Sequence, residues 1–147
     1  MLLRKIRLLF VGCLIGLWAF SSQAAEWTMA SGYPKSNFHT QNIIKFIDDV
    51  KSGSSVKINL NPNDTLIKLD AIKTSLQRGQ IPIGEIRFGI YGNEDPMYIL
   101  AGLPFIAPDY ASAWLLKEVK HAYLQEKFNK KGLRILYTSP WPGQGFY

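Results

Sequence analysis

The sequence GQIPIGEIRFGIYGNEDPMYILAGLPFIAPDY, residues Gly79–Tyr110, decides the fold class. Its first part, Ile81–Phe88, is a short apolar run that predicts a buried strand carrying Glu85 and Arg87. A polar loop, a compact LPFI turn and a helix that begins at Asp109 follow. An ionisable pair at the end of a buried strand, under a loop rich in turn formers, is typical of ligand clefts in open α/β sheets.

The remaining sequence alternates strand and helix signals without an internal repeat or a long linker. Residue patterns predict strands at 26–31, 56–60, 81–88 and 133–138, and helices at 36–53, 66–79 and 110–131. Ser36 or Asn37 is the expected cap of the first helix, and the three helices are expected to end at Gly53, Gly79 and Gly132. Strands separated by helices imply a mostly parallel sheet with helices on both faces. We therefore expect an α/β fold with one domain over residues 26–147.

The first 25 residues have the three parts of a secretory signal peptide. A basic region with Arg4, Lys5 and Arg7 precedes an apolar run at 8–20, and small residues follow near a cleavage point at Ala24 or Ala25. The sequence thus predicts export to the periplasm; an uncleaved anchor and lipidation of Cys13 are the alternatives. No cysteine follows Cys13, so the mature chain would contain neither a disulfide nor a thiolate metal site.

Net charge gives little support for a nucleic-acid partner. The formal charge of the whole chain is +6, and three of its 17 basic residues lie in the predicted leader. The main basic group surrounds the predicted end of the last helix and consists of Lys127, Lys130, Lys131 and Arg134. Basic residues there complement the helix dipole, so we expect no nucleic-acid binding.

The sequence carries no common catalytic signature: GxSxG, GxxxxGK[ST], GxGxxG after a strand, and HExxH are all missing. Only His39 and His121 are available as imidazoles, and the Asp48–Asp49 pair lies on a predicted solvated helix face. We expect no enzyme activity, no cofactor and no metal site.

The candidate site is a binding site beyond the carboxyl ends of the parallel strands. Its predicted ligand-binding residues are Tyr33, Lys68, Glu85, Arg87, Trp141, Gln144 and Tyr147, with Ser31 and Gly32 beside them. A cation with hydrogen-bonding aromatic and amide groups suits a small carboxylate. The alternatives are that Tyr33 and Trp141 only pack, that Lys68 is a solvated charge, and that Glu85 and Arg87 form a structural ion pair.

Four motifs resemble, in their order and spacing, the solute receptors of TRAP (tripartite ATP-independent periplasmic) transporters, bacterial extracellular solute-binding protein family 7. They are W-x-M-A-S-G-Y at 27–33, S-L-Q-R-G-Q-I-P-I-G-E at 75–85, D-P…L-P-F-I at 95–106 and G-L-R-I-L-Y…P-W-P-G-Q-G-F-Y at 132–147. The resemblance implies a two-lobed receptor for an organic acid, such as a dicarboxylate, that delivers its ligand to membrane subunits.

In that family a long helix links the lobes, and an arginine from the second half holds the ligand carboxylate. The family's other common arginine corresponds most closely to Tyr147 or lies beyond it. The resemblance thus implies that residues 26–147 form a first, N-terminal lobe with the second lobe missing. A receptor for an ABC transporter or a sensor, and an exported α/β enzyme domain with its active site in absent sequence, are the alternatives.

Overall fold

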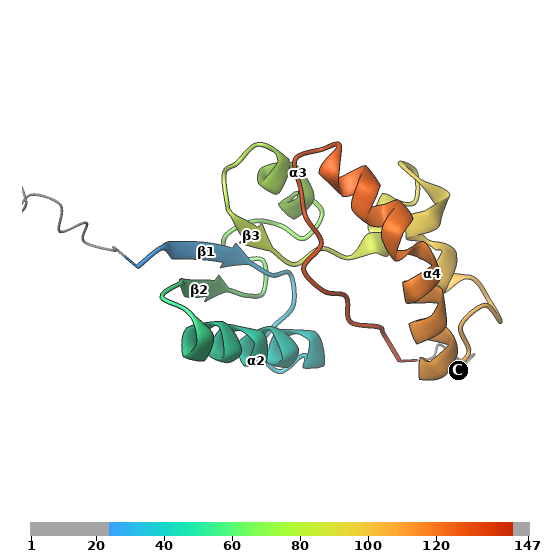
Figure 1. Ribbon diagram of the computed structural model, residues 1–147, viewed down its shortest axis with the longest axis horizontal. Helices are drawn as coiled ribbons and strands as arrows, with labels where there is room; N and C mark the ends of the chain where they lie inside the picture. The colour runs from blue at the N-terminus through green and yellow to red at the C-terminus, as the bar shows by residue number, and fades with distance from the viewer. Residues whose placement is uncertain (1–23, 143–147) are drawn as a thin grey trace, which may run out of the picture.

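The computed structural model describes residues 24–142, an α/β arrangement of three strands and three α-helices (Figure 1). The predicted leader therefore lies outside the described residues, except for Ala24 and Ala25. The strands are β1 (Glu26–Ala30), β2 (Lys57–Asn61) and β3 (Ile83–Gly84), and the helices are α2 (Phe38–Gly53), α3 (Ile72–Gln77) and α4 (Tyr110–Asn129). Short 3-10 turns at Phe88–Tyr91, Pro96–Tyr98 and Leu100–Gly102 connect β3 to α4.

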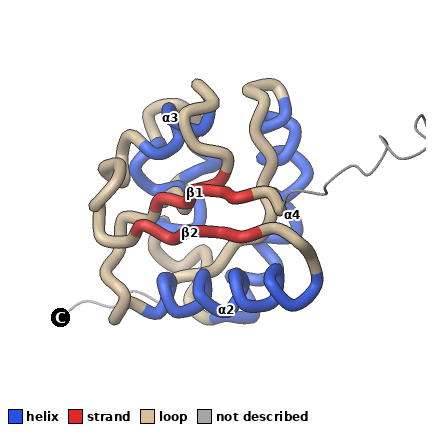
Figure 2. Tube along the Cα trace, turned by 90° about the vertical axis from the view of Figure 1, so that its left-hand side faces the viewer, coloured by secondary structure: helices blue, strands red, loops and turns tan. Residues whose placement is uncertain are grey.

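The sheet is parallel, as the sequence predicts, and its strand order is β2-β1-β3. Glu26 pairs with Lys57, and Met29 pairs with Ile83, so the first strand of the chain lies at the centre. Because neighbouring residues of a strand point to opposite faces, Met29 and Ala30 enter two different cores. Met29 packs with Ile43 of α2, and Ala30 packs with Ile72 of α3. Figure 2 shows α2 and α3 on opposite sides of the strands.

Helix α2 begins and ends where the sequence predicts. The Asn37 side chain accepts a hydrogen bond from the backbone N–H of His39 at 2.9 Å, which satisfies one of the free donors of the first turn. Its last residue is Gly53. Two other predicted helix ends are confirmed: Gly79 after α3 and Gly132 after α4 have φ values of +68° and +71°. Glycine adopts that left-handed conformation readily.

The predicted second helix is wrong in its first part, since α3 includes only Ile72–Gln77. The preceding residues form turns instead: Asn63 and Asp64 both have φ +58°. The Asp64 carboxylate then accepts a hydrogen bond from the backbone N–H of Leu69 at 2.9 Å. Such a local side-chain bond competes with helix formation, so the predicted Leu66–Leu69 turn of helix does not form.

The predicted strand at 81–88 is also too long, because only Ile83 and Gly84 pair with β1. Pro82 has no N–H to donate to a ladder. β1 itself ends at Ala30, whose carbonyl accepts one further bond from the N–H of Glu85 at 2.9 Å. After this bond the chain turns into the 3-10 segment Phe88–Tyr91.

The predicted last strand at 133–138 does not form; these residues have no regular secondary structure. In Figure 1 the segment runs beyond the ends of the strands, between the sheet and α4. Leu133 and Ile135 pack against the cluster formed by Tyr91, Tyr98, Leu124 and Phe128. The N–H of Ile135 donates to the Gln125 side chain at 3.3 Å, a contact to α4 that a strand of the sheet would not make.

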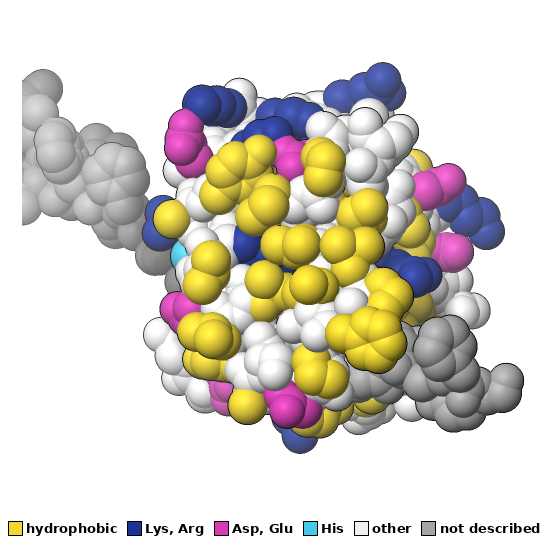
Figure 3. All heavy atoms as spheres, turned by 90° about the vertical axis from the view of Figure 1, so that its right-hand side faces the viewer, with side chains coloured by type: hydrophobic (Ala, Val, Ile, Leu, Met, Phe, Trp, Pro, Cys, Tyr) yellow, Lys and Arg dark blue, Asp and Glu magenta, His cyan; other side chains and the backbone are white. Residues whose placement is uncertain are grey.

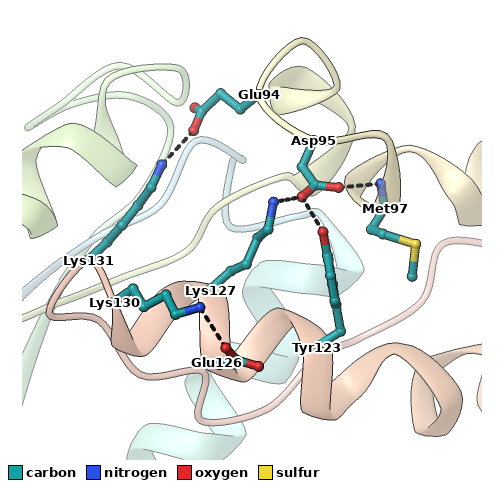
Figure 4. Close-up of polar contacts among 8 residues, drawn as sticks. All are labelled: Glu94, Asp95, Met97, Tyr123, Glu126, Lys127, Lys130 and Lys131. Carbon is teal, nitrogen blue, oxygen red and sulfur yellow. Dashed lines mark hydrogen bonds and ion pairs between the residues drawn. The ribbon is translucent and has the colours of Figure 1, made fainter.

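Helix α4 is held to the acidic loop Glu94–Asp95 by its own basic side chains (Figure 4). Asp95 is buried, accepts bonds from the Tyr123 hydroxyl and the Met97 N–H at 2.8 Å each, and pairs with Lys127. Glu94 pairs with Lys131 at 3.0 Å and with the buried Lys73. Three of the basic residues predicted to complement the helix dipole, Lys127, Lys130 and Lys131, thus bind carboxylates.

Candidate functional site

The carboxyl ends of β1 and β3 meet through a hydrogen bond between side chains. Ser31 directly follows β1 and is fully buried, and its hydroxyl donates to Glu85 Oε2 at 2.5 Å. Burial raises the pKa of Glu85, and the bond from Ser31 opposes that rise. Glu85 is thus a desolvated carboxyl group at the edge of the sheet where ligands bind in this class of fold.

An aromatic and a cationic side chain lie beside this carboxyl group. The Trp141 ring lies edge-on to Tyr33 with a centroid separation of 5.5 Å, and the Arg87 guanidinium lies 5.9 Å from the centre of the Trp141 ring. Burial raises the pKa of Tyr33, with Arg87 opposing and Glu85 reinforcing the rise. Tyr33, Glu85, Arg87 and Trp141 therefore form one group, which we call the sheet-edge cluster.

Helix α2 adds His39 to the same place. Its ring lies 4.5 Å from Trp141 and 4.1 Å from Phe38, between centroids. His39 is 6% exposed, and burial lowers its pKa. The Tyr137 ring packs on the Phe46 ring of α2 with a centroid separation of 5.3 Å. Burial and the Glu85 carboxyl group raise the pKa of Tyr137. The C-terminal segment thus lies against α2 through Tyr137 and Trp141.

Four of the seven predicted ligand-binding residues come together in this cluster. Lys68 is not among the contacts of this cluster; it borders a shallow hollow with Asp64, Leu69, Asp70 and Ile90. Gln144 and Tyr147 lie outside the described residues. The alternative of a Glu85–Arg87 ion pair does not hold within residues 24–142, since Glu85 bonds Ser31 and Arg87 lies over Trp141.

Sequence patterns alone did not indicate that His39 or Tyr137 belongs to the site. A histidine two residues after a cap residue lies in the first turn of its helix, close to the loop that follows β1. That position gives a signal for His39 once the strand order is known. Tyr137 gave no usable signal, because the predicted strand at 133–138 assigned it to the sheet.

Other kinds of site receive no support from the described part of the chain. Residues 24–142 contain no group of three or more His, Cys, Asp or Glu side chains placed to hold a metal ion. Within the same residues, none of the helices has the length and apolar character needed to cross a bilayer. A second shallow hollow is lined by Tyr98 and by the charged residues that join the acidic loop to the end of α4, namely Glu94, Asp95, Lys127, Lys130 and Lys131.

One face of the molecule is strongly apolar. Figure 3 shows hydrophobic side chains gathered on the face that carries α4. Phe105 of the predicted LPFI turn is 88% exposed, and Val119 of α4 is 72% exposed. Further exposed members of this face, which we call the α4 face, are Leu103, Ile106, Tyr110, Trp114 and Leu115. Contiguous apolar patches of this kind mark interaction surfaces.

Comparison with solved structures gives clear matches. An extracytoplasmic solute receptor of Bordetella pertussis, DctP6, is 38% identical with a TM-score of 0.78; the match covers 80% of this chain and 40% of the receptor. A second receptor of that organism, DctP7, is 34% identical with a TM-score of 0.77. This match covers 81% of this chain and 40% of DctP7. Both are described as binding pyroglutamic acid.

A TRAP solute-binding protein from a marine metagenome, described as specific for pyroglutamate, is 36% identical with a TM-score of 0.80. That match covers 85% of this chain and 42% of the metagenome protein. No protein-family model and no curated protein sequence matches the chain. The chain thus spans about two fifths of the length of the receptors that it matches. In sequence and in fold, it corresponds to a portion of a TRAP periplasmic solute-binding protein.

Proposed function

We propose that this chain supplies one lobe of a TRAP-type receptor that binds a small organic acid outside the cytoplasm. The observation that carries the proposal is the 34–38% identity to three receptors described as binding pyroglutamate, over at least 80% of this chain. In this role the chain is a binding protein and has no catalytic function. Membrane subunits of a TRAP transporter would receive the ligand.

The ligand class that we propose is a small cyclic acid with one carboxylate and a ring amide, as in pyroglutamate. The sheet-edge cluster supports this choice because it offers one cation, Arg87, beside an aromatic wall formed by Tyr33 and Trp141. A dicarboxylate would place a second negative charge near the desolvated Glu85 carboxyl group, which is unfavourable. We therefore favour pyroglutamate over the C4-dicarboxylates suggested by the family resemblance.

We further propose that residues 26–147 form the first lobe of a two-lobed receptor and that residues 1–25 form a cleaved signal peptide. The apolar α4 face supports the two-lobed arrangement, since such a surface is normally covered in a folded protein. Cleavage would follow Ala24 or Ala25. An intact mass of periplasmic protein that retains Met1, or that carries a lipid on Cys13, would contradict this proposal.

Calorimetry and ligand-detected NMR on the purified chain test the proposed function. We expect pyroglutamate to bind in preference to succinate and to glutamate, an open-chain dicarboxylate. Because a clam-like receptor encloses its ligand from two sides, the chain alone should bind with a Kd on the order of millimolar. Equal weak signals from all three acids would contradict the proposal, as would preference for succinate.

A further inference from the structure

Two buried polar atoms at the sheet edge have no hydrogen-bond partner among the described residues. They are the Tyr33 hydroxyl oxygen and His39 Nε2. In folded proteins nearly all buried polar atoms are satisfied by protein or by ordered water. Two unsatisfied atoms on neighbouring rings, 5.9 Å apart between centroids, therefore indicate a place where another polar group belongs.

Trp141 covers both rings. Its centroid is 5.5 Å from that of Tyr33 and 4.5 Å from that of His39. Trp141 is itself 41% exposed and belongs to a segment without regular secondary structure. A hydrogen bond of 3.3 Å, between the Asn42 side-chain amide and the Ser139 hydroxyl, links this segment to α2 near Trp141.

The chemistry beneath Trp141 suits an uncharged group. Burial lowers the pKa of His39, so its ring is neutral at pH 7, with one nitrogen as donor and the other as acceptor. The Tyr33 hydroxyl can also donate and accept. The Phe38 ring packs against His39, so an anion placed beside His39 would lose its hydration, and the nearby cation, Arg87, acts on the Tyr33 side of the subsite. Arg87 lies over Trp141 and offers the cation for a carboxylate.

We propose that Tyr33 and His39 form a polar subsite beneath Trp141 for an uncharged hydrogen-bonding group of the ligand, namely the amide of a lactam ring. The inference rests on the proposed function and assigns a task within it: Tyr33 and His39 recognise the ring amide, and the carboxylate lies toward Arg87. An amide matches this subsite because it carries both a donor N–H and an acceptor C=O.

NMR of the full chain labelled in its histidine rings tests the subsite directly. The chain has two histidines, His39 and the exposed His121, so each spectrum contains its own reference. The probes are pyroglutamate, 2-pyrrolidinone, which keeps the lactam and lacks the carboxylate, and cyclopentanecarboxylate, which keeps the acid and lacks the lactam. We expect the first two to shift the ring nitrogens of His39 in a saturable manner. Cyclopentanecarboxylate should leave His39 unchanged, and none should move His121.

Tyr33→Phe provides the matched variant, because it removes only the hydroxyl group and keeps the packing against Trp141. This variant should bind 2-pyrrolidinone and pyroglutamate about tenfold more weakly, while its affinity for cyclopentanecarboxylate stays the same. Calorimetric binding of pyroglutamate without any His39 shift would overturn the subsite and leave the proposed function intact. The subsite would also be overturned if cyclopentanecarboxylate shifted the His39 ring signals as pyroglutamate does. The same conclusion would follow if 2-pyrrolidinone left the His39 ring signals unchanged at every concentration. Binding of 2-pyrrolidinone with no preference for pyroglutamate would support the subsite and contradict the proposed function.

Discussion

Ser31 Oγ lies 2.5 Å from Glu85 Oε2, and this bond joins the residue after β1 to the residue after β3. Both residues belong to the sequence positions from which open parallel sheets build their ligand sites. The bond fixes the Glu85 carboxyl group within the sheet-edge cluster. It also gives this carboxyl group two separable roles, one in stability and one in binding.

The stability role predicts a pH dependence. Because the pKa of Glu85 is raised above its ordinary value of 4.5, the folded chain holds this proton more tightly than the unfolded chain does. The resulting stabilisation is complete below pH 4.5 and is lost as the pH rises through the raised pKa. Glu85→Gln should flatten this part of the profile, as measured by urea unfolding at several pH values.

Glu26→Gln is the control for the pH prediction. Glu26 is exposed, and its pKa is lowered by bonds from Asn59 and Lys57. Its contribution therefore has the opposite sign: it is present above the ordinary pKa and is lost as the pH falls. Parallel profiles for the parent chain and Glu85→Gln would contradict the prediction.

The binding role predicts that Glu85→Gln weakens pyroglutamate binding about tenfold, or about 1.4 kcal/mol. The physical reason is the loss of a charged acceptor in a desolvated position. Ligand titration followed by NMR at constant pH measures the change, with Glu26→Gln again as the control. If the melting temperature falls sharply and the affinity stays the same, Glu85 has only a structural role.

The Asp95 clamp predicts a graded loss of stability. Asp95→Ala removes the acceptor for Met97, Tyr123 and Lys127 at a buried position and should cost about 2–3 kcal/mol. Tyr123→Phe removes one of these bonds and should cost about 1 kcal/mol. Urea unfolding followed by circular dichroism measures both values. Equal costs for the two variants would show that the clamp does not act through Asp95.

The sheet and α3 approach each other closely at Gly84. A Cβ atom added there would lie 2.7 Å from Cγ2 of the fully buried Ile72. Gly84→Ala should therefore destabilise the chain by about 1–3 kcal/mol. At Gly53 an added Cβ meets no atom within 4 Å, so Gly53→Ala should be neutral or slightly stabilising. Thermal melts of the two variants compare the positions; a similar effect for both would contradict the packing argument.

The α4 face predicts the outcome of two charge substitutions. The double variant Leu115→Lys/Val119→Lys should self-associate less and should bind less of a dye that recognises apolar surface. Its stability should change little, because both side chains are already exposed. Dye fluorescence and sedimentation velocity measure these properties. Leu124→Lys, on the buried face of the same helix, should unfold the chain. Unchanged self-association in the double variant would show that another surface is responsible.

Local signals in the sequence predicted the parts of the fold that depend on local chemistry. The cap at Asn37 and the glycines at 79 and 132 set helix ends through bonds and φ values that involve few neighbours. The length of β3 could not be predicted in this way. It depends on where β1 ends, since Ala30 accepts the last bond, from Glu85.

The candidate site, like the fold, was predictable only where its residues are placed by nearby sequence. Tyr33 and Trp141 follow predicted strands, and Glu85 and Arg87 lie near the end of another, so the general rule for parallel sheets predicted that they come together. His39 and Tyr137 join them through the packing of α2 against the C-terminal segment, which no single stretch of sequence reveals. Lys68 precedes α3 and does not lie on its first turn, because turns that begin at Asn63–Asp64 replace the first part of the predicted helix.

The central position of β1 has a consequence for the order in which the chain folds. β1 meets β2 across 31 residues, from Glu26 to Lys57, whereas it meets β3 across 54 residues, from Met29 to Ile83. Closing the longer loop costs about 0.5 kcal/mol more in chain entropy. We therefore expect the β1–α2–β2 unit to form first and the sheet-edge cluster to assemble last. Pulse-labelled hydrogen exchange should show the Ser31 amide, which bonds Asn61, protected before the Glu85 amide, which bonds Ala30.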